Sequence, residues 1–376
     1  MMAEMSKCDF VRQMIFVNPT VSLRNQFVRA RGNFSVSIGM GSHFFPWKAS
    51  PKITVYQPVT FLPLKRKFPI VKKIEDHMTL MVIQQLNRGM PYILFMNCPN
   101  IASHNLLDRI LERATLSIFD FSDDFSELGY DERTRKLFHQ NAAKYAGAAN
   151  IVLAVNAHVK NKYSYVNSNI HVLRNATNYE NFSRETYESI DVLERIKHHG
   201  SPIIGYSGIA NMGRIDGEVL DFLLHQRPNW QFVFVGPAHA NFVERYSTCH
   251  NVHILAPVAY QDLPRYMQYF DVAIVPFQDN ENTKGNDLLK LHDYLAMGKP
   301  VVSTNVGGAG DLKEAIRIAQ DPQDFLKNIE EVLVKHRSED VVAQRKRLAL
   351  KNSWGARIAE LEALVKESLA TKERLV

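Results

Sequence analysis

The 376-residue sequence has little cysteine: only Cys8, Cys98 and Cys249 occur, and they lie far apart. Their spacing fits no metal site, and three cysteines provide no disulfide framework, which favours a reducing compartment. No apolar run approaches the ~20 residues that cross a bilayer. The first residues, MMAEMSKCDF, lack the apolar core of a signal peptide. We therefore expect a cytoplasmic protein.

Several common ligand-binding motifs are also missing. The sequence contains no P-loop, no zinc-ligand spacing, no internal repeat and no low-complexity segment. Gly39-Met40-Gly41 does not form a dinucleotide fingerprint, because the third glycine and the strand-to-helix setting are absent. None of these sites is therefore expected.

The remaining composition is that of an ordinary globular protein, with 45% hydrophobic and 22% charged residues. Its length suggests two domains, at the usual ~100–200 residues each. The net charge of +6 and the isoelectric point near 9.0 indicate an anionic partner, such as a nucleotide, an anionic lipid surface or nucleic acid.

The most informative pattern lies in residues 271–304. An apolar run at residues 272–275 predicts a buried parallel strand, and residues 278–287 form a polar loop. Residues 288–297 then predict a helix that ends at Gly298. In an open α/β sheet, ligands bind beyond the carboxyl ends of the strands, where a helix N-terminus favours an anion such as phosphate.

Two charged residues in this predicted helix suit a nucleotide. Lys290 lies in the first turn and would add a positive charge, and Asp293 offers an acceptor for ribose hydroxyls. The sequence KLHDYLAMGKPVV, residues 290–302, resembles the donor-site signature of GT-B glycosyltransferases. The resemblance implies that Asp293, five residues before Gly298, holds the nucleotide ribose. Many retaining members carry a second glutamate where this chain has Gly285, so the sequence leaves the stereochemical outcome open.

The resemblance covers about residues 14–354, weakly in the first half and strongly in the second. It implies an α/β GT-B fold, in which two Rossmann-like domains face each other across a cleft. We expect an N-terminal acceptor-binding domain at residues 1–182 and a linker at residues 183–200. A C-terminal nucleotide-sugar domain is expected at residues 201–353, followed at residues 354–376 by a helix that packs back on the N-terminal domain.

The beginning of the chain departs from this family. Its members normally have a strand and a glycine-containing loop before the strand that we predict at residues 14–17. The resemblance therefore implies a chain shortened at its N-terminus. The alternative is that residues 10–17 are themselves the first strand of the domain.

The resemblance adds further donor contacts. Gly208 ends the first strand of the second domain, where a missing side chain lets the backbone approach a ligand. Arg214 lies where the family places a basic residue against the diphosphate, a task that suits its planar guanidinium. The alternative is a surface arginine at the start of a helix. Val258 is expected near the nucleobase, and Asn286 and Leu289 near the helix N-terminus.

Three carboxylates follow the strand predicted at residues 116–119, namely Asp120, Asp123 and Asp124. One of them could take the proton of an acceptor hydroxyl, a role worth typically ~10²–10⁴-fold in rate. In the similar glucuronosyltransferase type of xanthan assembly, the proposed base lies in a Ser-Asp element that aligns with residues 122–123. Asp123 is therefore the first candidate, before Asp124 and Asp120. The alternative is that Asp123 or Asp124 caps the following helix.

Basic and bulky apolar residues alternate in residues 65–73, which begin with Lys65 and end with Lys73. Such a segment could lie on an anionic membrane surface, at about 1 kcal/mol per basic residue near the lipid. The alternative is a solvated loop whose apolar residues return to the core.

The predicted function is transfer of a sugar from a UDP- or GDP-linked donor to a glycan or lipid-linked acceptor in cell-surface polysaccharide synthesis. No cofactor, tightly bound metal or nucleic-acid partner is expected, because basic side chains and helix dipoles would stabilise the departing diphosphate. The protein would work in the cytoplasm or at the inner face of the membrane. The alternatives are a GT-B sugar-nucleotide epimerase and a non-catalytic homologue that binds a nucleotide-sugar.

Overall fold

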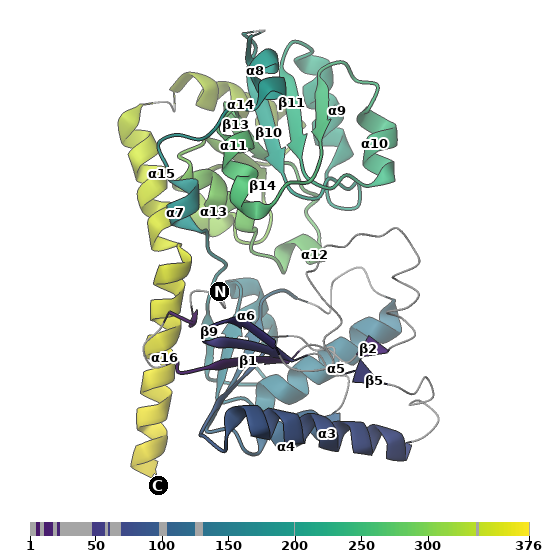
Figure 1. Ribbon diagram of the computed structural model, residues 1–376. Coiled ribbons are helices and arrows are strands. Elements are labelled where there is room, and N and C mark those ends of the chain that lie inside the picture. Colours follow the sequence, from purple (N-terminus) through teal and green to yellow (C-terminus); the bar gives the residue numbers. More distant parts are fainter. Residues whose placement is uncertain are drawn as a thin grey trace. The chain divides into compact units, whose positions relative to one another are not determined.

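The computed structural model in Figure 1 describes residues 5–7, 11–17, 21–22, 47–56, 59–60, 69–97, 104–124, 131–198, 200–335 and 338–375. Residues 65–68 of the basic segment at residues 65–73 therefore lie outside the described residues. The chain divides into two compact units. Unit 1 comprises Met1–Asp120, Leu137–Val152 and Lys366–Val376, and unit 2 comprises Phe121–Lys136 and Leu153–Val365. The domain bounds expected from the sequence stay a prediction.

A six-stranded parallel sheet forms the centre of unit 2, with the order β12-β11-β10-β13-β14-β15. Its strands are β10 (Ile203–Ser207), β11 (Gln231–Val235), β12 (Val252–Leu255), β13 (Val272–Val275), β14 (Val301–Thr304) and β15 (Arg317–Ala319). The two central strands, β10 and β13, are completely buried, as expected for apolar runs covered on both faces. The chain winds outward from β10 in one direction and from β13 in the other. A topological switch point therefore lies between β10 and β13.

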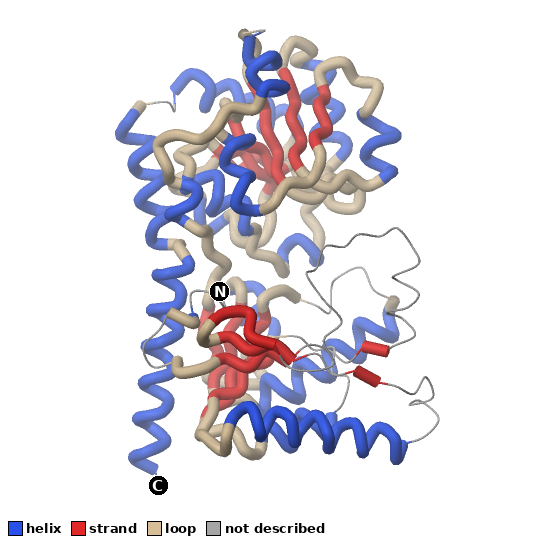
Figure 2. The backbone as a smooth tube through the Cα atoms, in the orientation of Figure 1, coloured by secondary structure: helices blue, strands red, loops and turns tan. Residues whose placement is uncertain are grey.

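Helices surround this sheet, as Figure 2 shows. They are α9 (Gly217–Gln226), α10 (Ala240–Tyr246), η1 (Tyr260–Asp262), α11 (Leu263–Met267), α12 (Glu281–Lys284), α13 (Leu289–Ala296), η2 (Gly310–Leu312), α14 (Pro322–Lys335) and α15 (Glu339–Lys351). The core between them is rich in buried aromatic side chains, including Tyr206, Phe234, Phe242 and Tyr294. This packing provides a rigid support for the loops at the strand ends.

Helix α13 ends as the sequence predicts. Gly298 has a φ of 70°, the left-handed conformation that glycine adopts without strain. Its N–H donates to the Leu295 carbonyl at 2.9 Å, and the Lys299 N–H donates to the Tyr294 carbonyl at 2.9 Å. These two bonds form a Schellman motif, which satisfies carbonyls that would otherwise lack partners at the helix end.

The remaining elements include a three-stranded sheet with the order β1-β4-β3, a two-stranded pair β2-β5 and a four-stranded sheet with the order β6-β7-β8-β9. Their strands are β1 (Met14–Val17), β2 (Val21–Ser22), β3 (Trp47–Ser50), β4 (Ile53–Tyr56), β5 (Val59–Thr60), β6 (Ile93–Met96), β7 (Leu116–Phe121), β8 (Ile151–Ala154) and β9 (Ile170–Val172). The helices are α3 (Pro69–Asn87), α4 (His104–Leu111), α5 (Glu132–Ala148), α6 (Ala157–Tyr163), α7 (Tyr179–Phe182) and α8 (Asp191–His198). The α/β class predicted from the sequence is confirmed.

The C-terminal helix, α16 (Trp354–Leu375), reaches unit 1 with its last turns. There Lys372 donates from Nζ to the Thr115 carbonyl at 2.7 Å and to Asn150 Oδ1 at 3.1 Å. These bonds anchor the end of the helix at the start of β7, as the predicted return of this helix requires. No helix within the described residues is long and apolar enough to cross a bilayer.

Candidate functional site

Two glycine turns lie side by side, Gly208 at the carboxyl end of β10 and Gly236 at the carboxyl end of the neighbouring strand β11. Gly208 has a φ of 121° and donates its N–H to the Val235 carbonyl at 2.8 Å. Gly236 has a φ of 136°, and a Cβ there would lie 2.5 Å from the Gly208 carbonyl oxygen. A Cβ at Gly208 would lie 2.9 Å from Lys290 Nζ. Glycine at position 208 therefore leaves the room that the lysine ammonium occupies.

Lys290 projects from the first turn of α13 onto an aromatic surface. Its Nζ donates to the Tyr206 hydroxyl at 2.8 Å and lies 3.9 Å from the centre of the Tyr206 ring. The centre of the Phe277 ring is 4.9 Å away, so the ammonium is held by aromatic faces rather than by a contacting carboxylate. Burial, with a smaller contribution from the charge of Arg214, lowers the pKa of Lys290 to about 7, against the opposing charge of Asp293. An anion bound here would favour the ammonium form.

Arg214 supplies a second positive charge at this place. Its carbonyl accepts the Gln278 N–H at 2.8 Å, and an isolated bridge pairs Ile215 with Phe277, so its backbone is tied to the loop after β13. Among the residues that the structure describes, no carboxylate lies within ion-pair distance of its guanidinium. Helix α9 begins three residues later, with Asp216 as its N-cap. Arg214 is thus free to meet an anion beside Lys290.

Asp293 lies one turn after Lys290 and is only 3% exposed. Its Oδ1 accepts the hydroxyls of Thr177 at 2.7 Å and Tyr260 at 2.8 Å. Burial raises the pKa of Asp293 to about 7, although these two hydrogen bonds and Lys290 favour the carboxylate. Neither Thr177 nor Tyr260 was identified from the sequence as part of the site. The role of Asp293 toward ribose stays a prediction.

The start of α13 has no side-chain cap. Leu288 is its N-cap residue and makes no side-chain hydrogen bond, and the first turn contains no acidic residue. Leu289 thus opens a helix whose first N–H groups have no capping side chain, as an anion site requires. Asn286 is buried, and its carbonyl accepts Asn156 Nδ2 at 2.9 Å. Val258 lies in the loop after β12, two residues before Tyr260.

The three predicted catalytic carboxylates have different surroundings. Asp120 lies within β7, because the strand continues to Phe121, so its expected place beyond the strand is wrong. Asp124 is 2% exposed, and its Oδ2 forms an ion pair with Lys162 Nζ at 2.7 Å. The next described helix, α5, is preceded by Asp131, whose carboxylate accepts the Thr134 N–H at 3.0 Å. Asp123 and Asp124 therefore do not cap it.

Asp123 has a strongly shifted pKa. Burial raises its pKa to about 6. The charge of Arg214 opposes this shift, and the carboxylates of Asp287 and Asp124 add to it. Burial is therefore the largest cause of the raised pKa, ahead of repulsion from the neighbouring carboxylates. A carboxyl group with a pKa near neutrality can accept a proton and release it again.

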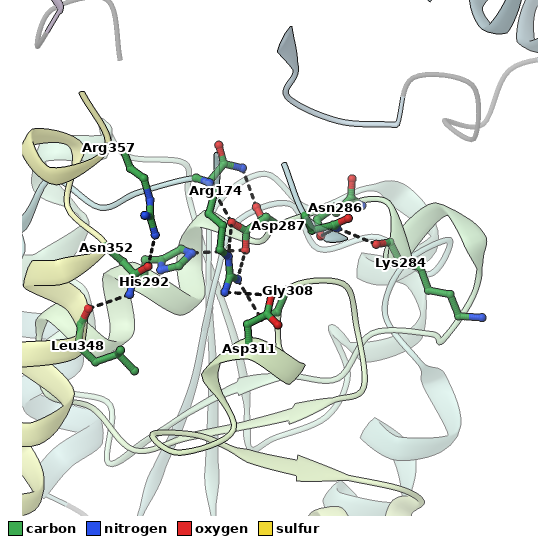
Figure 3. Close-up of polar contacts among 12 residues, drawn as sticks. Arg174, Lys284, Asn286, Asp287, His292, Gly308, Asp311, Leu348, Asn352 and Arg357 are labelled. Carbon is green, nitrogen blue, oxygen red and sulfur yellow. Dashed lines mark hydrogen bonds and ion pairs between the residues drawn. The ribbon is translucent and has the colours of Figure 1, made fainter. Parts of the chain in front are cut away.

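A buried polar cluster that the sequence did not reveal surrounds the start of α13, as Figure 3 shows. Asp287 Oδ1 pairs with Arg174 Nη2 at 2.6 Å, and Arg174 Nε donates to Asp287 Oδ2 at 3.2 Å. His292 Nε2 lies 3.4 Å from Asp287 Oδ1. Burial alone would raise the pKa of Asp287, but the contacts with His292 and Arg174 hold this pKa at about 2. Asp287 is therefore a permanent carboxylate.

Among the described residues, no group of three or more His, Cys, Asp or Glu side chains is arranged to hold a metal ion. The basic groups of the switch point are Lys290 and Arg214. The absence of a tightly bound metal from the reaction stays a prediction.

Comparisons with known proteins identify similar sequences and structures. Residues 218–335 match the family of glycosyl transferases group 1. The chain is also 25% identical over 192 residues to TuaH of Bacillus subtilis, which is named as a teichuronic acid biosynthesis glycosyltransferase. That match includes 49% of this chain and 48% of TuaH, so the chain spans about half the length of this curated relative.

Solved structures show the same fold. Sucrose-phosphate synthase of Thermosynechococcus elongatus has a TM-score of 0.63 at 16% identity, over 96% of this chain and 100% of that chain. HepE of Anabaena, solved with UDP and glucose, has a TM-score of 0.59 at 14% identity, over 84% of this chain and 86% of that chain. The chain therefore has the GT-B fold, and its residues 218–335 are similar in sequence to the group 1 glycosyl transferases.

Proposed function

We propose that this protein is a glycosyltransferase that moves a sugar from a nucleotide-sugar to an acceptor hydroxyl in polysaccharide synthesis. The observation that carries the proposal is Lys290. It is a partly buried lysine of lowered pKa, held on two aromatic rings at the uncapped start of α13 and beside the topological switch point. With Arg214 and the helix N-terminus, it offers the positive groups that a diphosphate needs.

The donor would lie along the carboxyl ends of β10 and β13. Its diphosphate would contact Lys290 and Arg214, and its ribose would contact Asp293. The nucleobase would lie near the loop of Val258. HepE was solved with UDP-glucose, and an E. coli protein of the same fold, with a TM-score of 0.61, was solved with UDP-2-fluoro glucose. UDP-sugars are therefore the first donors to test, before GDP-sugars.

In the proposed reaction, Asp123 takes the proton of the acceptor hydroxyl while the oxygen of that hydroxyl forms a bond to the anomeric carbon. The bond from that carbon to the diphosphate breaks, and the electron pair leaves with the nucleoside diphosphate. Lys290, Arg214 and the α13 N-terminus stabilise the negative charge that develops on the leaving group. This scheme inverts the anomeric configuration, because the base acts on the face opposite the leaving group.

A panel of nucleotide-sugars, followed by product analysis, tests this function. A donor at 100 times its dissociation constant should stabilise the fold by about 2.7 kcal/mol in thermal unfolding. Incubation with that donor and a glycan or lipid-linked acceptor should give a glycosylated acceptor and a free nucleoside diphosphate. A free epimerised nucleotide-sugar would instead identify an epimerase, and a bound but unchanged donor would identify a non-catalytic homologue.

Asp293→Asn is expected to weaken the binding of UDP and GDP about tenfold or more, because a charged acceptor for ribose becomes a neutral amide. Calorimetry at pH 8, above the pKa of about 7, measures the effect on the ionised carboxylate. Tyr260→Phe is the matched control, since it removes one donor to Asp293 but leaves the carboxylate. Equal affinities of the Asp293→Asn variant and the unchanged protein would show that the ribose lies elsewhere.

The acceptor side of the proposal includes contact with an anionic membrane. On α3, the apolar side chains of Ile70, Ile74, Met78 and Met81 are 67%, 56%, 59% and 55% exposed. Their spacing places them on one face of the helix. Lys73 and His77 lie beside them and are exposed, whereas the two acidic residues of α3 are buried or partly buried. An apolar stripe flanked by basic groups suits the surface of an anionic bilayer.

Co-sedimentation with phosphatidylglycerol vesicles tests this contact. Binding should decrease with added salt, because exposed charges are screened within ~10 Å at 0.1 M. The combined change Ile74→Ser and Met78→Ser should abolish most of it by removing apolar area from the lipid. Val334→Ser, at a residue of α14 that is 81% exposed, is the control and should change nothing. If vesicle binding changes neither with salt nor in the combined Ile74→Ser and Met78→Ser variant, the exposed apolar residues of α3 do not contact the membrane and are ordinary solvated surface.

A further inference from the structure

We infer that Asp287, held by Arg174, is a positioning residue that fixes the start of α13 and thereby the place of the Lys290 ammonium. The inference rests on the proposed function of Lys290 at the donor diphosphate. Neither Asp287 nor Arg174 would touch the donor. Their effect would pass through the backbone of Leu288 and Leu289, the two residues that separate Asp287 from Lys290.

The carboxylate of Asp287 is occupied on both oxygens by the segment of Arg174 and Asn175. In addition to the two bonds from the guanidinium, Asp287 Oδ2 accepts the Asn175 N–H at 2.9 Å. The Asn175 side chain donates from Nδ2 to the Asp287 carbonyl at 2.7 Å. Side chain and backbone of Asp287 are thus both fixed, which leaves this residue a single position.

The turn after β14 closes over the same ion pair. Arg174 Nη2 donates to the Gly308 carbonyl at 2.8 Å, a bond that Figure 3 draws together with the bonds of Arg174 to Asp287. Gly308 has a φ of 81°, and a Cβ there would lie 2.3 Å from Asp287 Oδ1. A Cβ at Gly307 would lie 2.3 Å from the Lys284 carbonyl oxygen. The two glycines therefore let a third chain segment pack directly on the loop that precedes α13.

A second anchor holds the other end of this loop. Asn156, the N-cap of α6, donates from Nδ2 to the carbonyls of Lys284 and Asn286, each at 2.9 Å. The loop from α12 to α13 is thus fixed on both sides of Asn286. Since Leu288 gives no side-chain cap, the contacts of Asp287, the residue before it, hold the backbone where it enters the first turn of α13.

The position of Lys290 depends on that first turn. Its Nζ must reach the Tyr206 hydroxyl at 2.8 Å and pass over Gly208, where no Cβ fits. A displacement of reacting or binding groups by about 1 Å can cost about 10²-fold in rate. A loosened helix start would therefore move the ammonium off its aromatic site, even though no residue that contacts the donor has changed.

The test uses the double variant Arg174→Met with Asp287→Asn in the full chain. Either single change would leave a buried ion without its partner, which is the usual cause of unfolding in such variants. The double change removes both charges and avoids this. We expect the double variant to fold, by circular dichroism, and to bind UDP at least tenfold more weakly in calorimetry. Arg227→Met, which breaks the more exposed ion pair with Glu330, is the matched control and should bind UDP normally.

A second readout separates positioning from a purely structural role. NMR titration of the Lys290 side chain should show its pKa moving from about 7 toward the ordinary value of 10.5 in the double variant, because the ammonium leaves its buried site. A folded double variant with unchanged UDP affinity and an unchanged Lys290 titration would overturn the inference while the proposed function stands. If the unchanged protein binds neither UDP nor GDP, the proposed function fails, and the Lys290 titration alone still decides the positioning role.

Discussion

Asp123→Asn is expected to lower the rate of sugar transfer about 10²-fold or more and to leave the affinity for the nucleotide-sugar nearly unchanged. An amide cannot take the proton of the acceptor hydroxyl, but it keeps the shape of the side chain. The other two candidates are less suited to this role. Asp124 already forms an ion pair with Lys162, and Asp120 is a buried residue of β7.

The pH dependence of the rate identifies the base. Because the proposed base Asp123 would act only as a carboxylate and burial raises its pKa to about 6, turnover at saturating donor should rise with pH through about 6 and then level off. Arg214 lowers this pKa, so Arg214→Ala should shift the rise to higher pH. An unchanged rise near pH 6 in Arg214→Ala would assign it to another group.

Asp131→Asn is the control for this prediction, because it makes the same chemical change at an exposed residue before α5, where asparagine also caps a helix well. It should transfer sugar at the wild-type rate. If Asp123→Asn transfers at more than a tenth of the wild-type rate, Asp123 is not the base, and a retaining mechanism, which needs no base at this place, becomes the better interpretation.

The parts of the site that the sequence predicted correctly carry their signal locally. The strand β13, the polar loop, α13 and the turn at Gly298 follow each other within 33 residues, from Val272 to Thr304, and each has its own pattern of apolar residues, breakers or glycine. Strand ends were less certain. The apolar run that predicts β7 stops at Phe119, but the strand continues to Phe121 and includes Asp120, because backbone pairing does not require apolar side chains.

The contacts that hold the site together could not be predicted in this way. Arg174 and Asp287 are 113 residues apart, and Thr177 and Asp293 are 116 apart. No periodicity or spacing within one sequence links such positions, and only the folded chain brings them together. The sequence likewise placed a charge at Lys290, but its aromatic surroundings come from Tyr206 and Phe277, on two other segments.

These surroundings make Lys290 the residue on which donor binding should depend most. Lys290→Ala is expected to weaken UDP and GDP binding roughly 10- to 100-fold, since a charge-assisted hydrogen bond to a phosphate contributes about 1.5–3 kcal/mol. Calorimetry measures the effect directly. Lys299→Ala, at a lysine just past the other end of α13 that donates to the Gln268 carbonyl at 2.6 Å, is the control and should bind normally.

The same lysine should make donor binding depend on pH. Its ammonium form would bind the diphosphate, and its pKa in the free protein is about 7, so affinity should fall as the pH rises above 7. Asp293, with a raised pKa of about 7, acts in the opposite direction because its carboxylate form would bind ribose. The titration is therefore measured in Asp293→Asn, where Tyr206, Phe277 and Arg214 still surround the ammonium. The diphosphate lies elsewhere if Lys290→Ala leaves the UDP affinity unchanged. The same conclusion follows if the UDP affinity of Asp293→Asn does not fall above pH 7.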